Sequence, residues 1–162
     1  MSWWARKARQ FRTHLTARVR PAERAALAAW LRPPELELFD AMHVADRRHG
    51  LDVVAALRRS GVNDRDVLAA GLLHDCAKGD TGVGPRVVWS LGEAFGPWVW
   101  RAASVVPGWA AALERLRHHA EASAAMVEAA GLPPHAVDLV RHQADPRDPE
   151  YGRLFQLADE AA

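Results

Sequence analysis

The 162-residue chain is 49% hydrophobic and 25% charged, has a formal net charge of +1 and contains a single cysteine. These values exclude a largely disordered chain, an internal disulfide framework and a multi-cysteine zinc knuckle, and they fit one compact globular domain. No uninterrupted apolar run approaches the ~20 residues that a membrane-spanning helix needs, and the net charge gives no reason to expect stable nucleic-acid binding. Eight histidines beside one cysteine instead favour a metal site built from nitrogen and oxygen ligands.

Residues 1–20 are the most basic segment of the chain and carry a charge of +6. The basic residues, with no acid among them, are Arg6, Lys7, Arg9, Arg12, Arg18 and Arg20. Trp4, Ala8, Phe11 and Leu15 recur at helical spacing, which predicts a basic amphipathic helical arm. Such an arm suits peripheral contact with anionic lipid or a polyanionic partner; the alternative is that its aromatic face docks on the rest of the chain. It lacks the apolar region of a secretory signal, so we expect a cytoplasmic protein.

Residues 21–162 are predicted to form a single all-α domain. Ala, Leu and Arg are abundant, β-branched runs are scarce, and Pro and Gly divide the sequence into helical blocks. The predicted helices cover residues 21–31, 35–42, 46–60, 86–95, 97–105, 110–130, 133–143 and 150–162. One further helix begins after an N-cap at Asn63 or Asp64, and residues 79–85 are predicted to form a Gly-rich loop.

Two successive helices in this pattern carry a clear apolar face. The helix that Asp46 is predicted to cap presents a stripe of Gly50, Val53, Val54 and Leu57. The next helix has its apolar residues at Val67, Leu68, Leu72 and Leu73. Both faces are therefore predicted to be buried.

The most informative segment is residues 72–79, with the sequence LLHDCAKG. Its apolar helical run delivers His74 and Asp75 side by side, and polar groups in such a place need partners because their desolvation is costly. Helix neighbours point ~100° apart, but both side chains can reach one ion that lies over the helix end. Imidazole nitrogen and carboxylate oxygen suit Zn, Mn or Fe. The alternative is a capping histidine and an aspartate at the end of a helix.

Two residues on other helices strengthen the metal interpretation. His49 lies one turn before Val53 on the apolar stripe of its own helix, and Asp159 interrupts an otherwise apolar helix near the C-terminus. Taken singly, such a histidine is more often a satisfied core group, and such an aspartate is more often solvated. Together with His74 and Asp75, they form a set on separate helices of one small domain, which favours a common site.

The order His49, then His74 and Asp75, then Asp159 resembles the H…HD…D signature of the HD superfamily of metal-dependent phosphohydrolases. The sequence RHGLDVV at residues 48–54 resembles the first motif of that family, and LLHDCAK resembles its LLHDxxK motif. The resemblance covers about residues 45–161. It implies a compact multi-helix bundle, here with a basic N-terminal helical arm, in which residues 21–162 form the HD domain.

Two further segments resemble those of family members that hold two metals. The sequence HAEASA from His119 resembles their HPExGA segment, and His142 resembles the histidine that follows it. The resemblance implies one or two divalent transition-metal ions (Fe, Mn, Zn, Co or Ni), with Asp75 as a bridging carboxylate. The implied ligands are His49, His74, Asp75, His119, His142 and Asp159. His118 competes with His119, which the His-x-Glu spacing favours, and the alternative for His119 and His142 is an exposed histidine on each helix.

Two basic residues are candidates for contacting a phosphate. Lys78 follows His74 by one helical turn and would offer a point charge to a phosphate oxygen. The predicted catalytic residues are Asp75 and Lys78, and Lys78 is also predicted to bind the substrate. Arg48 is the second predicted phosphate contact, with Arg47 as its competitor; the alternative for each arginine is a solvated position at the start of a helix.

The HDxAK pattern and the size of the chain resemble most closely the small bacterial HD proteins that hydrolyse dinucleoside polyphosphates. The resemblance implies a hydrolase that attacks a nucleotide or related phosphoester with a metal-activated hydroxide. The alternative is a non-catalytic HD module that binds a nucleotide or a protein in signalling, although such modules usually lose ligands and the implied set is complete here. A cluster of Trp89, Trp98, Trp100 and Trp109 suits stacking on a nucleobase, with core packing or the surface of a homodimer as the alternative.

Overall fold

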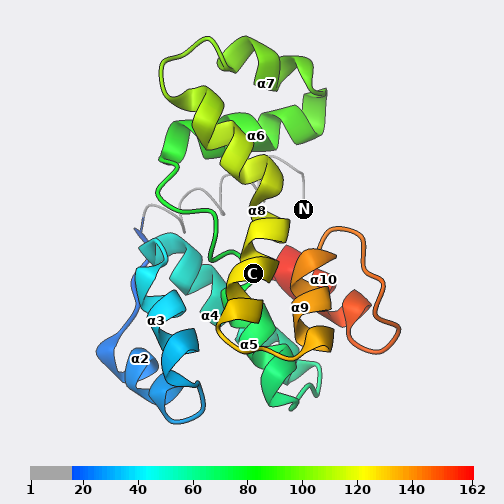
Figure 1. Ribbon diagram of the computed structural model, residues 1–162. Coiled ribbons are helices and arrows are strands. Elements are labelled where there is room, and N and C mark those ends of the chain that lie inside the picture. The colour runs from blue at the N-terminus through cyan, green and yellow to red at the C-terminus, as the bar shows by residue number, and fades with distance from the viewer. Residues whose placement is uncertain (1–15) are drawn as a thin grey trace.

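The computed structural model describes residues 16–162, and all regular secondary structure in this part of the chain is helical (Figure 1). The helices are α2 (Pro21–Ala28), α3 (Pro33–Ala41), α4 (Val44–Arg59), α5 (Arg65–Leu73), α6 (Val83–Phe95), α7 (Trp98–Ala103), α8 (Trp109–Ala129), α9 (Pro134–Arg141) and α10 (Gly152–Ala161). The all-α prediction is confirmed. The apolar face predicted for the N-terminal arm falls on residues 1–15 and lies outside the described residues. No helix among the described residues combines the length and apolar character needed to cross a membrane.

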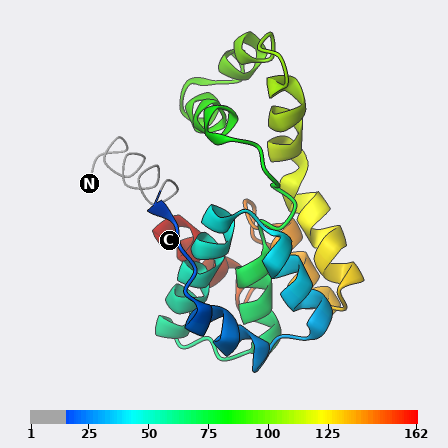
Figure 2. The same cartoon turned by 90° about the vertical axis from the view of Figure 1, so that its left-hand side faces the viewer.

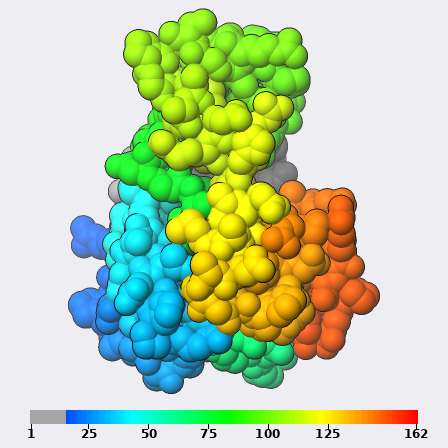
Figure 3. All heavy atoms as spheres, viewed as in Figure 1, coloured from blue at the N-terminus to red at the C-terminus, as the bar shows by residue number. Residues whose placement is uncertain are grey.

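The helices form a bundle with a smaller lobe above it, as the ribbon and the space-filling view both show (Figures 1 and 3). The bundle contains α2 to α5, α9 and α10, the lobe contains α6 and α7, and the long α8 runs from the lobe into the bundle. Figure 2 shows the segment between α5 and α6 rising from the bundle to the lobe. The end of α5 and the middle of α8 therefore lie near the junction of the two parts.

The hydrophobic core lies in the bundle, and α4 and α5 supply much of it. All four residues of the stripe predicted on α4 are buried, and Val53 and Leu57 are fully inaccessible to solvent. Gly50 on this stripe touches α5 so closely that a β-carbon there would lie 2.2 Å from the carbonyl oxygen of Leu72. The absence of a side chain at this position lets the backbones of α4 and α5 touch just before His74.

Several helix starts differ from those predicted, because tertiary contacts and proline geometry decide them. His43, rather than Asp46, caps α4: its Nδ1 accepts a hydrogen bond from the N–H of Ala45 at 3.2 Å. Asp46 cannot act as a cap, because both of its carboxylate oxygens accept hydrogen bonds from Arg86. At the next helix, Asp64 is the N-cap and accepts from the N–H groups of Asp66 and Val67.

Prolines explain other boundary differences. α3 begins at Pro33, and α6 begins at Val83, inside the segment predicted as loop, with Pro85 in its first turn. Proline is tolerated there because the first N–H groups of a helix have no helical acceptor. α10 begins at Gly152, two residues later than predicted, since the side chain of Asp148 accepts from the N–H groups of the two residues after Pro149 in a tight turn.

The lobe is held together by tryptophans that pack on glycines. Trp109 covers Gly84, and Trp100 lies so close to Gly92 that a β-carbon there would clash with the indole. Trp100 also stacks on Trp89, with ring centroids 4.6 Å apart, and donates its indole N–H to the Trp89 carbonyl. Trp98 is the exception in the predicted cluster, with 64% of its surface exposed. Three of the four tryptophans thus pack within the lobe while staying partly exposed, and a role of the cluster in nucleobase stacking or in a homodimer stays a prediction.

Candidate metal centre

Histidine and aspartate side chains from four elements meet at the C-terminal end of α5. His49 comes from α4, His74 and Asp75 from the turn directly after α5, His119 from the middle of α8, and Asp159 from α10. His74 and Asp75 are almost fully buried, whereas His49, His119 and Asp159 retain partial exposure. The site therefore lies at the junction of bundle and lobe, and it opens to solvent on one side.

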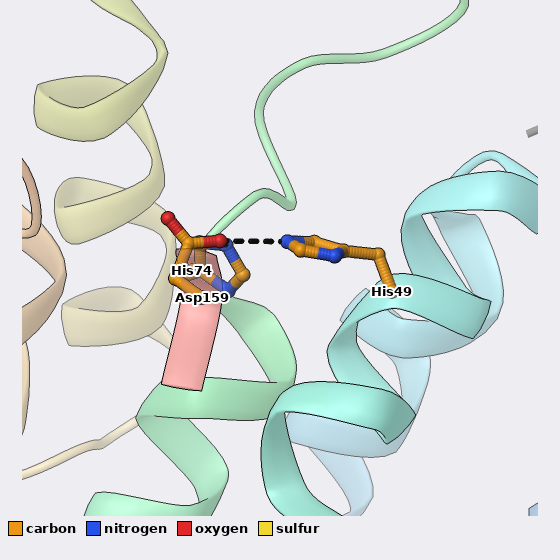
Figure 4. Close-up of side chains that lie close together, drawn as sticks. All are labelled: His49, His74 and Asp159. Atoms are coloured by element: carbon orange, nitrogen blue, oxygen red, sulfur yellow. Dashed lines mark hydrogen bonds and ion pairs between the residues drawn. The ribbon is translucent and has the colours of Figure 1, made fainter. Parts of the chain in front are cut away.

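His49, His74 and Asp159 form the tightest group (Figure 4). The Oδ1 atom of Asp159 lies 2.7 Å from Nε2 of His49 and 3.3 Å from Nε2 of His74. One potential ligand atom from each residue lies within 4.8 Å of the other two, which is close enough for a shared metal ion. Three residues separated by 25 and 85 positions in the sequence thus converge on one point.

Asp75 extends this group toward α8. Its Oδ2 lies 3.5 Å from Nε2 of His74 and 2.5 Å from Nζ of Lys78. Its Oδ1 lies 3.5 Å from Nε2 of His119, is buried, and has no hydrogen-bond partner. A buried carboxylate oxygen without a partner is costly unless it binds something else, and a cation is the natural candidate.

The orientation of the histidines leaves their Nε2 atoms facing the centre. Nδ1 of His74 donates to the Gly71 carbonyl at 2.9 Å, and Nδ1 of His119 donates to the Leu116 carbonyl at 2.6 Å. A carbonyl can only accept, so each Nδ1 carries a proton, and Nε2 is the nitrogen that remains for a metal, as in histidines that bind metals. His118 points away: its Nε2 lies 3.0 Å from a carboxylate oxygen of Glu114, and 63% of its side chain is exposed.

The charges of the centre are strongly coupled. Burial by itself would lower the pKa of His74, but the carboxylates of Asp75 and Asp159 outweigh burial and raise this pKa to about 9. Burial would raise the pKa of each carboxyl group, but the histidines hold both below the usual range, with the help of Lys78 at Asp75. The pKa of His119 is lowered, mainly by burial and by the charge of Lys78. Without a metal, a proton on His74 and the ammonium of Lys78 offset the charge of the carboxylates; a divalent cation at the centre would displace that proton.

Comparison with known proteins agrees with this geometry. The HD domain family matches residues 42–162 of the chain, and this stretch contains every residue of the centre. The chain belongs to the HD domain family. Members of this family are generally metal-dependent hydrolases. No curated protein and no solved structure gives a significant match to the chain.

The donor set of this HD domain fits a divalent transition metal. The group offers imidazole nitrogens and carboxylate oxygens without a thiolate, a combination that suits Fe, Mn, Zn, Co or Ni. Cys76 follows the HD pair, but its Sγ lies 3.9 Å from the Ser123 carbonyl, and burial raises the pKa of the thiol to about 11. A buried neutral thiol is a poor ligand, so Cys76 packs beside the centre without contributing to it.

Two predicted site residues have their side chains held by other partners. Nδ1 of His142 lies 3.0 Å from Oδ1 of Asp138 and 3.2 Å from the Asp138 carbonyl, and His142 is not in the tight group. The guanidinium of Arg48 donates to Glu23 and Asp52, each at 2.8 Å. Metal binding by His142 and phosphate binding by Arg48 stay predictions, and Arg48 would have to leave these ion pairs to reach a substrate.

Sequence reasoning missed the residues that hold the HD turn, defined here as residues 74–79. Ser123 on α8 accepts a hydrogen bond from the N–H of Ala77 at 3.0 Å, and Gln143 donates to the His74 carbonyl at 3.4 Å. Arg86 on α6 donates to the Gly79 carbonyl at 3.0 Å. Ser123 lies on the apolar face of α8 and is fully buried. The sequence could have indicated its role, because a polar residue within an apolar stripe needs a hydrogen-bond partner. Nothing in the sequence pattern marks Gln143 or Arg86.

Proposed function

We propose that this HD domain is a metal-dependent phosphohydrolase that cleaves a phosphoester or phosphoanhydride bond in a nucleotide or related small molecule. The observation that carries the proposal is the position of Asp75. Its two carboxylate oxygens face different histidines, His74 on one side and His119 on the other, and Oδ1 has no hydrogen-bond partner. This arrangement supports a carboxylate that bridges two cation positions.

The proposed ligands divide between the two sides of Asp75. His49, His74 and Asp159 would hold one ion, and His119 would contribute to a second, with His142 as a further candidate ligand. When bound, such ions act as Lewis acids on the phosphoryl group and lower the pKa of a coordinated water. The chain's own contribution is to fix the imidazoles through Nδ1, so that their Nε2 atoms stay in place.

Lys78 is the proposed contact for the phosphoryl oxygens. Its ammonium lies 2.5 Å from Asp75 Oδ2, and 23% of its side chain is exposed, so it reaches both the buried carboxylate and the open side of the centre. The neighbouring carboxylates raise the pKa of Lys78 despite its burial, which keeps the amine protonated at neutral pH. A fixed positive charge at this position would stabilise the negative charge that develops on the phosphoryl oxygens.

The substrate class within this function is a dinucleoside polyphosphate or another small nucleotide. The support for it is the HDxAK sequence that Asp75 and Lys78 share with hydrolases of that kind. A phosphoanhydride offers several charged oxygens, which suit a centre with cations on both sides of Asp75 and the ammonium of Lys78 beside it.

The decisive experiment combines metal analysis with a substrate panel. The purified protein is assayed for bound metals, and phosphate release is measured with mononucleotides, cyclic nucleotides and dinucleoside polyphosphates in the presence of Mn²⁺, Fe²⁺, Co²⁺, Ni²⁺ or Zn²⁺. We expect metal-dependent release that falls by about 100-fold or more in Asp75→Ala. Full activity in Asp75→Ala would contradict the proposed site.

The adjacent histidines of α8 provide a matched pair of variants. His119→Ala is expected to lose metal and activity, whereas His118→Ala removes an exposed imidazole one residue away and is expected to keep both. Equal losses in the two variants would contradict the assignment of His119. A wild-type protein that binds metal tightly and a nucleotide without cleaving it would instead identify a non-catalytic binding module.

A further inference from the structure

Arg86 does not itself face the metal centre, but its guanidinium makes several polar contacts close to that centre. Its guanidinium donates to Oδ1 and Oδ2 of Asp46 at 2.6 and 2.7 Å, to Oγ1 of Thr81 at 2.9 Å and to the carbonyl of Gly79 at 3.0 Å. All three partners are on segments that flank the centre: α4, which carries His49, and residues 79–81, where the HD turn ends. Arg86 therefore joins the lobe to both of these segments.

Asp46 is a buried carboxylate close to the catalytic groups. Its side chain is 6% exposed, and it lies one turn before His49 on α4. Nη2 of Arg86 contacts both Oδ2 of Asp46 and the carbonyl of Gly79, so this carboxylate lies beside the residue that follows Lys78, and its charge adds to that of Asp75 in raising the pKa of Lys78. Two carboxylates, Asp75 and Asp46, thus attract the same flexible lysine side chain.

The shapes of the two cations explain how the carboxylates are shared. A guanidinium is a planar fork that binds both oxygens of a carboxylate, whereas an ammonium is a point charge on a flexible stem. The fork of Arg86 occupies both oxygens of Asp46, and the ammonium of Lys78 contacts Asp75 through Oδ2 alone. Oδ1 of Asp75 is left without a hydrogen-bond partner as a result.

We propose that Arg86 and Asp46 form a positioning pair that directs the Lys78 ammonium onto Asp75 Oδ2 and toward the phosphoryl group. The pair has two effects: it neutralises the carboxylate that competes for Lys78, and it fixes the end of the HD turn through Gly79 and Thr81. The effect of this pair on catalysis rests on the proposed phosphohydrolase function. The placement of Lys78 by the pair does not depend on that function.

The lysine content of the chain allows a direct test of this placement. The sequence has two lysines, Lys7 and Lys78, so protein that carries Lys7→Arg and ¹³C-labelled lysine gives one side-chain NMR signal, from Lys78. The spectrum is recorded at constant pH without metal or substrate. We expect Arg86→Gln to shift this signal, because the unpaired Asp46 attracts the ammonium. The double variant Asp46→Asn/Arg86→Gln also removes the competing negative charge, so its Lys78 signal is expected to return toward the wild-type position.

The control is a surface ion pair that also engages both oxygens of a carboxylate. Arg24 donates to both oxygens of Asp40, away from the metal centre, at 3.1 and 2.5 Å, so Arg24→Gln is expected to leave the Lys78 signal unchanged. An unchanged signal in Arg86→Gln, or a double variant shifted as far as the single one, would overturn the proposal. If Arg86→Gln does not fold, Arg86→His takes its place, because one imidazole cannot span both oxygens of Asp46 and it adds no second lysine signal.

Activity provides a second, separate measurement. With the substrate found in the panel, Arg86→Gln is expected to lower kcat by at least about tenfold with a smaller change in KM, and the double variant to regain most of that loss. A double variant that is as slow as Arg86→Gln would show that the pair acts only as a cross-link and would overturn the positioning role. If the wild-type protein cleaves nothing, the proposed function fails, while the NMR signal still decides the placement of Lys78.

Discussion

Gly50 on α4 and Leu72 on α5 touch through their backbones, and this contact sets the distance between the two helices that carry His49 and His74. A β-carbon at position 50 would lie 2.2 Å from the Leu72 carbonyl oxygen and 3.1 Å from its carbon. Both obstacles are backbone atoms, which cannot rotate away as side chains can. The imidazoles of His49 and His74, with ring centroids 5.2 Å apart, depend on this close approach.

Gly50→Ala is therefore expected to push α4 away from α5. We expect a loss of about 3 kcal/mol or more in the free energy of unfolding, and weaker metal binding, since His49 moves with α4. Gly71→Ala is the comparison: its β-carbon would meet the Leu57 and Val53 side chains at 2.7 and 3.2 Å, which can shift. Urea unfolding of the two variants should rank Gly50→Ala as clearly more damaging, and the reverse order would contradict the role of this contact.

Ser123 is expected to matter for the HD turn despite its distance from the ligands in sequence. Ser123→Ala leaves the partly buried N–H of Ala77 without its acceptor, which costs about 1–2 kcal/mol in the free energy of unfolding. It also frees the turn between Asp75 and Lys78, so metal affinity should fall as well. Ser104→Ala removes an exposed hydroxyl that donates to the Trp100 carbonyl and is expected to change neither quantity.

Cys76 is expected to be chemically inert in the folded protein. The residue is 8% exposed, and burial raises the pKa of its thiol to about 11, so very little thiolate is present at pH 8. Alkylation by iodoacetamide at pH 8 should be slow until urea unfolds the chain and then become rapid. The single cysteine makes mass spectrometry a direct readout, and rapid alkylation of the folded protein would contradict its burial.

Glu35 is expected to make the stability of the protein depend on pH in the acid range. It is fully buried, and although burial raises the pKa of its carboxyl group, the guanidinium groups of Arg65 and Arg32 outweigh this and lower it. A lowered pKa in the folded state means that the stabilisation is complete above the unfolded value, about 4.5, and is lost as the pH falls below it toward the folded value.

Glu35→Gln should therefore destabilise the protein by about 3 kcal/mol at neutral pH, because the two guanidinium groups lose a charged partner. Its stability should also fall less steeply below pH 4.5 than that of the wild type. Glu37→Gln, on the exposed face of the same helix, is expected to stay within about 0.5 kcal/mol of the wild type. Urea unfolding at several pH values measures both effects, and parallel curves for wild type and Glu35→Gln would exclude the proposed coupling.

The helices and the outline of the site could be predicted because their signals are local or share a fixed order. The apolar stripe around Val53 and Leu57 has helical spacing, and both residues are fully buried. His49, the HD pair and Asp159 interrupt apolar helices in the order typical of the family, and the structure brings three of these four residues into one tight group. The ligand roles of these residues, and that of His142, stay predictions.

The N-cap of α4 at His43 could not be predicted, because it depends on competition between partners for the Asp46 side chain. Asp46 has the residue type of an N-cap, but Arg86, forty residues away, binds its carboxylate. The same applies to Arg48: its position beside His49 suggests a phosphate contact, while Glu23 and Asp52 hold its guanidinium. Sequence spacing describes which face of a helix a residue occupies, and it carries no information about the side chain that arrives from another helix.

By itself, then, the amino-acid sequence determined an all-α chain and its buried faces and indicated a set of candidate nitrogen and oxygen ligands, because helical periodicity and residue chemistry are properties of short segments. Only the tertiary structure decided which neighbour faces the centre, His119 and not His118, and which cation meets which carboxylate, Lys78 on Asp75 and Arg86 on Asp46. The physical reason is that buried charges must be paired, and the partners that pair them come from helices far apart in the chain.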